Sequence, residues 1–157
     1  MASLHDYLVP IEKLNLGQLL ETWKWLTGKD KTVIALTKMG DAILKDSNNS
    51  LYHLDTGGGE IELKSKNYLD FFEGKLEGEE YELILLPNLV EELKDKGQML
   101  GMYQVYAFIK IPLLGGTYNT DNIYIVDLYE HYSLTGEFHF KLKDLPAGTD
   151  VEVIIAE

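Results

Sequence analysis

The chain has 157 residues, of which 45% are hydrophobic and 25% are charged, a balance that is ordinary for a globular protein and far from that of a disordered chain. Its formal net charge of -12 repels nucleic acid and anionic membrane surfaces and attracts basic partners. Because a chain of this length usually builds one core, we expect residues 1–157 to form a single α+β domain.

The residue inventory excludes several kinds of chemistry. All 14 cationic residues are lysine, so the guanidinium group that grips phosphates with two hydrogen bonds is missing. Cysteine is absent, which removes disulfides, thiolate nucleophiles and thiolate metal sites. The sequence has neither a signal peptide nor an apolar run that approaches the ~20 residues of a membrane span, so we expect a cytoplasmic protein.

The first predicted element is an N-terminal helix over residues 14–26. Its apolar residues recur at the spacing that places them on one helix face. Asn15 is a suitable N-cap, and Gly28 is a suitable stop. Trp23 belongs to the apolar face, so we expect Trp25 at its rim, with contact to a partner as the alternative.

An antiparallel meander is predicted next. Its four short strands are expected at residues 32–38, 41–45, 51–55 and 60–64, with turn-forming residues between them. The turn at 46–50 begins with the spacing of a calcium loop, but Leu51 stands where that loop requires glycine. Residues 57–59 lack the spacing of a phosphate-binding loop. We therefore interpret both segments as turns.

The middle of the chain is predicted to be helical, in three short helices at 67–73, 80–86 and 87–96. In the first of these helices we expect Leu69 and either Phe71 or Phe72 to point inward. Pro87 suits the first turn of the third helix, and Gly97 suits its end. The acidic residues of the third helix are interpreted as a solvated face.

Two strands, 104–111 and 122–128, are predicted to lie at the centre of the sheet, because their apolar residues do not alternate and therefore suit burial on both faces. For 129–145 the periodicity fits either a strand or a helix. We favour a helix that starts near Thr135 and stops at Pro146. A final strand is expected at 151–155.

Catalytic and metal-binding motifs are weak in this sequence. No GxSxG elbow or HExxH helix is present. His131 and His139 flank Glu137, but two histidines eight residues apart need a third, long-range ligand to hold an ion. We therefore predict no metal, no cofactor and no enzymatic activity, with His139 and Glu137 as an acid–base pair kept as a weaker alternative.

Six short motifs follow one another along the chain. They are WKWL at 23–26, MGDAIL at 39–44, LYHLDxGxG at 51–59, PxLVEEL at 87–93, LGGxYxxxN at 114–122 and HYSxxGxxHxxxKDLPxG at 131–148. Together they resemble a bacterial family that includes the immunity domain of type VI secretion DNase effectors. The resemblance implies a cytoplasmic α+β protein that binds and silences a toxin without catalysis. The family's best-described members carry an additional N-terminal domain.

The leading hypothesis is a toxin-neutralising protein that inhibits a basic effector, such as a nuclease, by stoichiometric binding. A nuclease needs a cationic surface to hold phosphates, so an acidic inhibitor gains electrostatic steering toward it. The predicted partner-binding residues are Asp121, Asp127, Glu130, Tyr118 and Tyr129. The alternative is a small-molecule-binding regulatory domain without catalysis, which requires a deep apolar pocket lined by aromatic residues.

Overall fold

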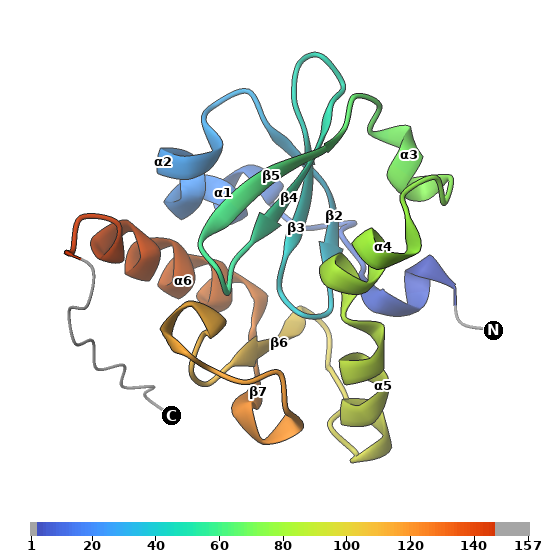
Figure 1. The fold of residues 1–157 in the computed structure, drawn as a ribbon, viewed down its shortest axis with the longest axis vertical. Helices are drawn as coiled ribbons and strands as arrows, with labels where there is room; N and C mark the ends of the chain where they lie inside the picture. The colour runs from blue at the N-terminus through green and yellow to red at the C-terminus, as the bar shows by residue number, and fades with distance from the viewer. Residues whose placement is uncertain (1–2, 147–157) are drawn as a thin grey trace.

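The computed structural model describes residues 3–146, in which a five-stranded antiparallel sheet lies between two groups of helices (Figure 1). The sheet has the strand order β1-β2-β3-β4-β5. Its strands are β1 (Leu8–Val9), β2 (Thr32–Thr37), β3 (Ala42–Lys45), β4 (Leu51–Asp55) and β5 (Glu60–Ser65). The predicted α+β class and the predicted meander are confirmed, and the short β1 adds an edge strand to it.

Alternation along the strands divides the core between the two faces of the sheet. Within β3, Ala42 and Leu44 belong to one hydrophobic cluster, and Ile43 belongs to another. The helices that contribute to the first cluster are α1 (Leu16–Leu20), η2 (Glu21–Trp23) and α6 (Leu128–Leu142). Those that contribute to the second are α3 (Leu69–Phe72) and α4 (Gly78–Leu85).

The N-terminal helical run forms where it was predicted, but a 3-10 turn interrupts the α-helix in its middle. It consists of α1, the 3-10 turn η2 and α2 (Lys24–Thr27). The Asn15 side chain accepts a hydrogen bond from the backbone N–H of Gln18 at 3.0 Å, and Gly28 ends the run with a φ of 76°. Trp23 is fully buried, whereas Trp25 is half-buried and donates to the carbonyl of Gly136. Both tryptophan predictions are confirmed.

The helical middle is also confirmed, with one difference. Phe71 is buried, but Leu69 and Phe72 are exposed, so the inward orientation predicted for Leu69 is wrong. Helix α3 has only four residues, and a single helical turn presents about one side chain to the core. Helix α5 (Pro87–Asp95) follows α4 directly and packs Leu89, Val90 and Leu93 into a third cluster.

The predicted central position of 104–111 and 122–128 is wrong. β6 (Gln104–Phe108) and β7 (Ile123–Asp127) pair with each other in a separate two-stranded antiparallel sheet. The backbone N–H of Tyr106 donates to the carbonyl of Lys38 at 2.8 Å, which ties β6 to the β2–β3 turn. Val105 and Ala107 enter the first cluster and Tyr106 enters the third, so burial on both faces occurs without a central place in a sheet.

Helix α6 confirms the helical interpretation of 129–145 but starts earlier than predicted, at Leu128 instead of near Thr135. Strand β7 passes into α6 without an intervening turn, and Asp127 caps the helix by accepting from the N–H of Glu130 at 3.0 Å. The strand predicted at 151–155 lies outside the described residues. Among helices within 3–146, none is long and apolar enough to cross a membrane.

Candidate partner-binding site

A cavity of about 400 Å³ opens where β4 and β5 face α4. We name it the acidic pocket, and its lining residues are His53, Asp55, Glu60, Glu62, Lys64, Leu83, Leu86 and Tyr118. It therefore combines three carboxylates and a histidine from the sheet with apolar side chains from the helical middle and a tyrosine from the β6–β7 connection. Lysines are scarce in this lining, since Lys64 is the single one.

The strand sequence explains why the carboxylates gather. In β5, Glu60, Glu62 and Lys64 are two residues apart and share one face of the sheet. The register places Asp55 of β4 opposite Glu60, and His53 opposite Glu62. Two carboxylates that face each other across strands destabilise a sheet. Sheet stability therefore does not account for the Asp55–Glu60 pair.

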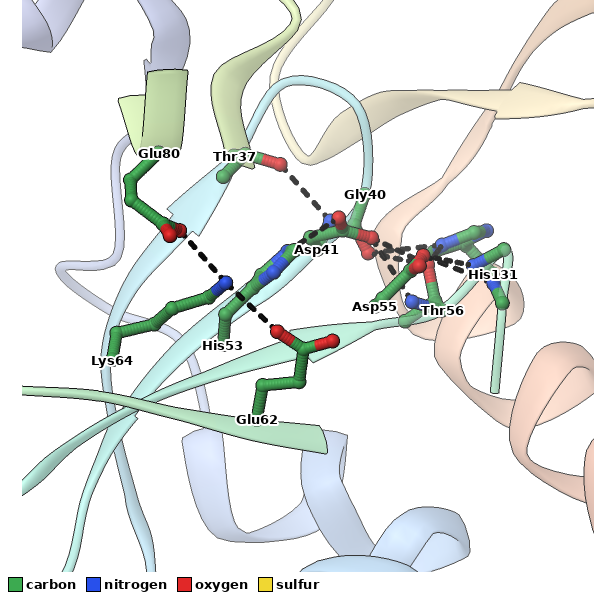
Figure 2. A network of polar contacts seen from close by, with 12 residues as sticks. Thr37, Gly40, Asp41, His53, Asp55, Thr56, Glu62, Lys64, Glu80 and His131 are labelled. Atoms are coloured by element: carbon green, nitrogen blue, oxygen red, sulfur yellow. Dashed lines mark hydrogen bonds and ion pairs between the residues drawn. The ribbon is translucent and has the colours of Figure 1, made fainter. Parts of the chain in front are cut away.

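Lys64 is held between two glutamates. Its Nζ lies 2.9 Å from Glu62 Oε2 and 2.8 Å from Glu80 Oε2, the latter on α4 (Figure 2). Burial opposes the charge of Lys64, but the hydrogen bonds to Glu80 and Glu62 outweigh it and raise the pKa of the ammonium. Glu62 and Glu80 already neutralise the charge of Lys64. Lys64 therefore does not neutralise the negative charges of Asp55 and Glu60.

Asp55 is a half-buried residue that lines the acidic pocket. Its Oδ1 accepts from the backbone N–H groups of Gly57 at 3.1 Å and Gly58 at 3.0 Å, which fixes the β4–β5 turn. Burial, with a further contribution from the charge of Asp41, raises the pKa of Asp55 to about 6. The carboxyl is thus mostly ionised at pH 7 and takes up its proton within a mildly acidic range.

A buried polar network lies beside this pocket and joins the meander to α6 (Figure 2). His53 Nε2 donates to Asp41 Oδ2 at 2.8 Å. The hydroxyl of Thr56 lies 3.1 Å from Asp41 Oδ1 and 3.0 Å from His131 Nε2. His139 Nε2 lies 2.8 Å from the carbonyl oxygen of Thr56, so we assign its proton to Nε2. Thr56 is therefore hydrogen-bonded to both histidines of α6, to His131 through its hydroxyl and to His139 through its carbonyl oxygen.

The histidines of α6 serve to dock the helix. Burial lowers the pKa of His131 to about 4 and also lowers the pKa of His139, so both are neutral at pH 7. A Cβ at Gly40 would overlap the ring of His131, and a Cβ at Gly59 would overlap that of His139. The two glycines thereby permit the close approach of α6 to the turns of the meander.

The acid–base alternative is not supported by this geometry. His139 is buried, whereas Glu137 is exposed, and two positions apart on a helix they point in different directions. Among the described residues, no group of three or more histidine or carboxylate side chains is arranged to hold a metal ion.

The five predicted partner-binding residues divide between different parts of the molecule. Tyr118 lines the acidic pocket, is 53% exposed and rests edge-on against Phe108. Asp127 and Glu130 are exposed at the start of α6, at the other end of β7 from the exposed Asp121, which lies in η4 (Thr120–Asn122). The hydroxyl of the half-buried Tyr129 accepts from the backbone N–H of Asn15 at 3.0 Å. Only Tyr118 of the five lines this pocket.

Sequence reasoning missed the other pocket residues. The alternation of Glu60, Glu62 and Lys64 was visible in the sequence and could have indicated a charged strand face. Leu83, which is 64% exposed on α4, gave no comparable signal, because its neighbours Ile84 and Leu85 are buried.

The comparison with family models agrees with the resemblance seen in the sequence. Residues 65–139 match the model of the family described as "T6SS immunity protein Tdi1, C-terminal", where T6SS is the type VI secretion system. No curated protein matches the chain. The crystal structure of Atu4351 from Agrobacterium tumefaciens is similar at 15% sequence identity and a TM-score of 0.49, over 78% of this chain and 64% of that chain. The chain thus spans less than two thirds of Atu4351.

The matched range extends from the last residue of β5 into α6 and includes Leu83, Leu86 and Tyr118 of the acidic pocket. The motifs from Trp23 to Gly59 precede it. Residues 65–139 are thus similar to the T6SS immunity protein Tdi1 C-terminal family, in agreement with the resemblance that the sequence motifs indicated.

Proposed function

We propose that this protein neutralises a basic effector by stoichiometric binding, and that its acidic pocket receives a basic side chain of that effector. The observation that carries the proposal is a pocket of carboxylates within a chain whose 65–139 region matches an immunity family. In this proposal the protein acts in the cytoplasm and without catalysis.

The pocket suits a lysine or arginine of the partner. Asp55 and Glu60 make no ion pair within residues 3–146, so their charges are available to a cation. Leu83 and Tyr118 are exposed beside them and offer apolar surface to the aliphatic stem of such a side chain. Tyrosine and arginine are both enriched in binding hot spots, which suits a contact between Tyr118 and an arginine of the partner.

A nuclease is the kind of effector that fits this surface best. Its phosphate-binding cleft must be cationic, and the net charge of -12 attracts such a cleft over long range. Asp121, Asp127, Glu130 and Tyr129 are proposed as outer contacts that add to this attraction. Because exposed charges are screened by salt, we expect the association rate to fall as ionic strength rises.

The first test compares two charge reversals in the full chain, and the titrant is an effector whose toxicity is suppressed when this chain is co-expressed with it. Glu60→Lys with Glu62→Lys reverses the pocket, and Glu92→Lys with Glu137→Lys makes the same change of net charge at exposed positions that do not line it. We expect the pocket pair to weaken binding about 100-fold or more, because it sets cation against cation. The control pair should change the dissociation constant about threefold or less.

Calorimetry measures the affinity, and growth of cells that co-express the effector measures neutralisation. Loss of both with the pocket pair alone supports the proposal. Equal effects of the two pairs would show that net charge, and not the pocket, controls binding. Leu83→Ala and Leu134→Ala provide a second matched pair of exposed leucines, of which only Leu83 lines the pocket and should weaken binding.

A further inference from the structure

A second cavity, of about 540 Å³, lies between β1, helix α5, the start of β6 and the loop at 99–103. We name it the lysine pocket. Its walls are mainly aliphatic, aromatic and methionine side chains, but three lysines, Lys13, Lys38 and Lys94, also line it, together with a single carboxylate, Glu12. The side chains that line it therefore include more cations than anions, in a chain whose net charge is -12.

Lys38 is a partly buried cation of this pocket. It makes no ion pair within residues 3–146, and the contact of Lys94 with Glu91 is long, at 3.9 Å. Burial and then repulsion from Lys94 lower the pKa of Lys38, against the opposing charges of Asp6 and Glu91. An anion placed between Lys38 and Lys94 would offset both unfavourable effects.

The apolar part of the lysine pocket is adaptable. Met99 and Met102 are 63% and 80% exposed, and unbranched methionine side chains adjust readily to an apolar ligand. Tyr106 is buried at the base, and its hydroxyl donates to the carbonyl of Gln98, so its ring serves as a fixed wall. Tyr103 lines the same cavity with a left-handed φ of 61°, a conformation that costs energy in a non-glycine residue.

We propose that the lysine pocket binds a small amphipathic carboxylate, with its apolar chain against the methionine and tyrosine side chains and its carboxylate between Lys38 and Lys94. The cavity volume lies within the range of small-molecule sites, roughly 300–1,000 Å³. The pocket shares no lining residue with the acidic pocket. This inference is therefore independent of the proposed effector binding.

The test uses octanoate as the probe and the methionine methyl groups as reporters. The full chain has only four methionines, so ¹³C-methyl labelling gives few signals. We expect octanoate to shift the Met99 and Met102 methyl resonances with saturation at one equivalent bound. Octanol and octyltrimethylammonium have the same chain without the negative charge, and each should need about tenfold higher concentration or more.

Substitutions of single lysines test which ammonium group binds the carboxylate of octanoate. Lys38→Gln should weaken octanoate binding about tenfold, whereas Lys141→Gln, at an exposed lysine of α6 that lines neither pocket, should not change it. The resonance of the buried Met39 shows whether each variant is folded, and Lys94→Gln replaces Lys38→Gln if the latter is not. Equal response to octanoate and octyltrimethylammonium, or equal affinity of the two lysine variants, would overturn the proposal.

Discussion

Lys64 and Lys38 line two cavities of the same protein in opposite electrostatic settings. Lys64 has two glutamate oxygens within 2.9 Å, and its pKa is raised. Lys38 has no ion-pair partner among the described residues, and its pKa is lowered, first by burial and then by Lys94. The difference shows that a lysine can be neutralised by carboxylates in one pocket and can lack a counterion in another. The side chains packed around the lysine determine which of these two situations occurs.

The origin of this difference lies in the local sequence. β5 alternates acidic and apolar residues, so carboxylates line up on the face that Lys64 shares. Lys38 follows a strand of apolar residues and meets Lys94 from a distant helix. Five of the eight residues that line the acidic pocket thus come from the adjacent strands β4 and β5, whereas the lysine pocket is lined by segments that lie farther apart in sequence.

The largest effect that we expect concerns Asp55. Its folded-state pKa of about 6 exceeds its ordinary value of 3.8, so the folded state holds the proton more tightly than the unfolded state does. Asp55 therefore contributes stability below about pH 4 that is lost as the pH rises through about 6. Asp55→Asn keeps an oxygen acceptor for the turn but cannot ionise.

Between pH 4 and pH 7.5, the free energy of unfolding of Asp55→Asn should consequently rise relative to wild type, by up to about 3 kcal/mol for a shift of roughly two pKa units. Urea unfolding at both pH values measures this change, with Asp95→Asn as the exposed control. A difference that does not vary with pH would mean that Asp55 has no raised pKa and that the acidic pocket is more solvated than described.

Lys64→Met is expected to have the second-largest effect. It leaves Glu62 and Glu80 without the ammonium between them, although these partners remain 59% and 38% exposed and are screened by water. We expect a loss of about 1–2 kcal/mol in the free energy of unfolding, between the values typical of surface and buried ion pairs. High salt should reduce this loss. A neutral result would show that the two contacts with Lys64 do not stabilise the fold.

The same substitution at Lys38 should have the smallest effect and the opposite sign. Lys38→Met removes an ammonium that has no ion pair within residues 3–146, and it places an apolar group against an apolar wall. We expect a gain of up to about 1 kcal/mol in the free energy of unfolding. Destabilisation as large as that of Lys64→Met would remove the contrast between the two pockets.

Local patterns predicted most of the fold. Turn residues marked the meander, and the cap at Asn15 and the stop at Gly28 were both readable from the sequence. The start of α6 was missed because Asp127 stands between a strand and a helix without a turn, and so it was interpreted only as an exposed acidic residue. The central strands were misplaced because burial on both faces also arises between two helix-covered clusters.

The binding surfaces were less predictable, for a different physical reason. Tyr118 was named as a partner-binding residue on its residue type, but its position in the acidic pocket depends on the packing of this loop residue against Phe108 of β6. The lysine pocket joins β1 to residues near 100 and to α5. Periodicity within one segment carries no information about such long-range contacts.

The most direct test of the two-pocket description measures both ligands on the same two variants. Calorimetric titration with the effector and methyl NMR titration with octanoate are applied to Glu60→Lys/Glu62→Lys and to Lys38→Gln. We predict that the glutamate pair loses effector binding and retains octanoate binding, and that Lys38→Gln does the reverse. If either variant weakens both ligands to the same degree, the two pockets are not separate sites, and this description of the protein is contradicted.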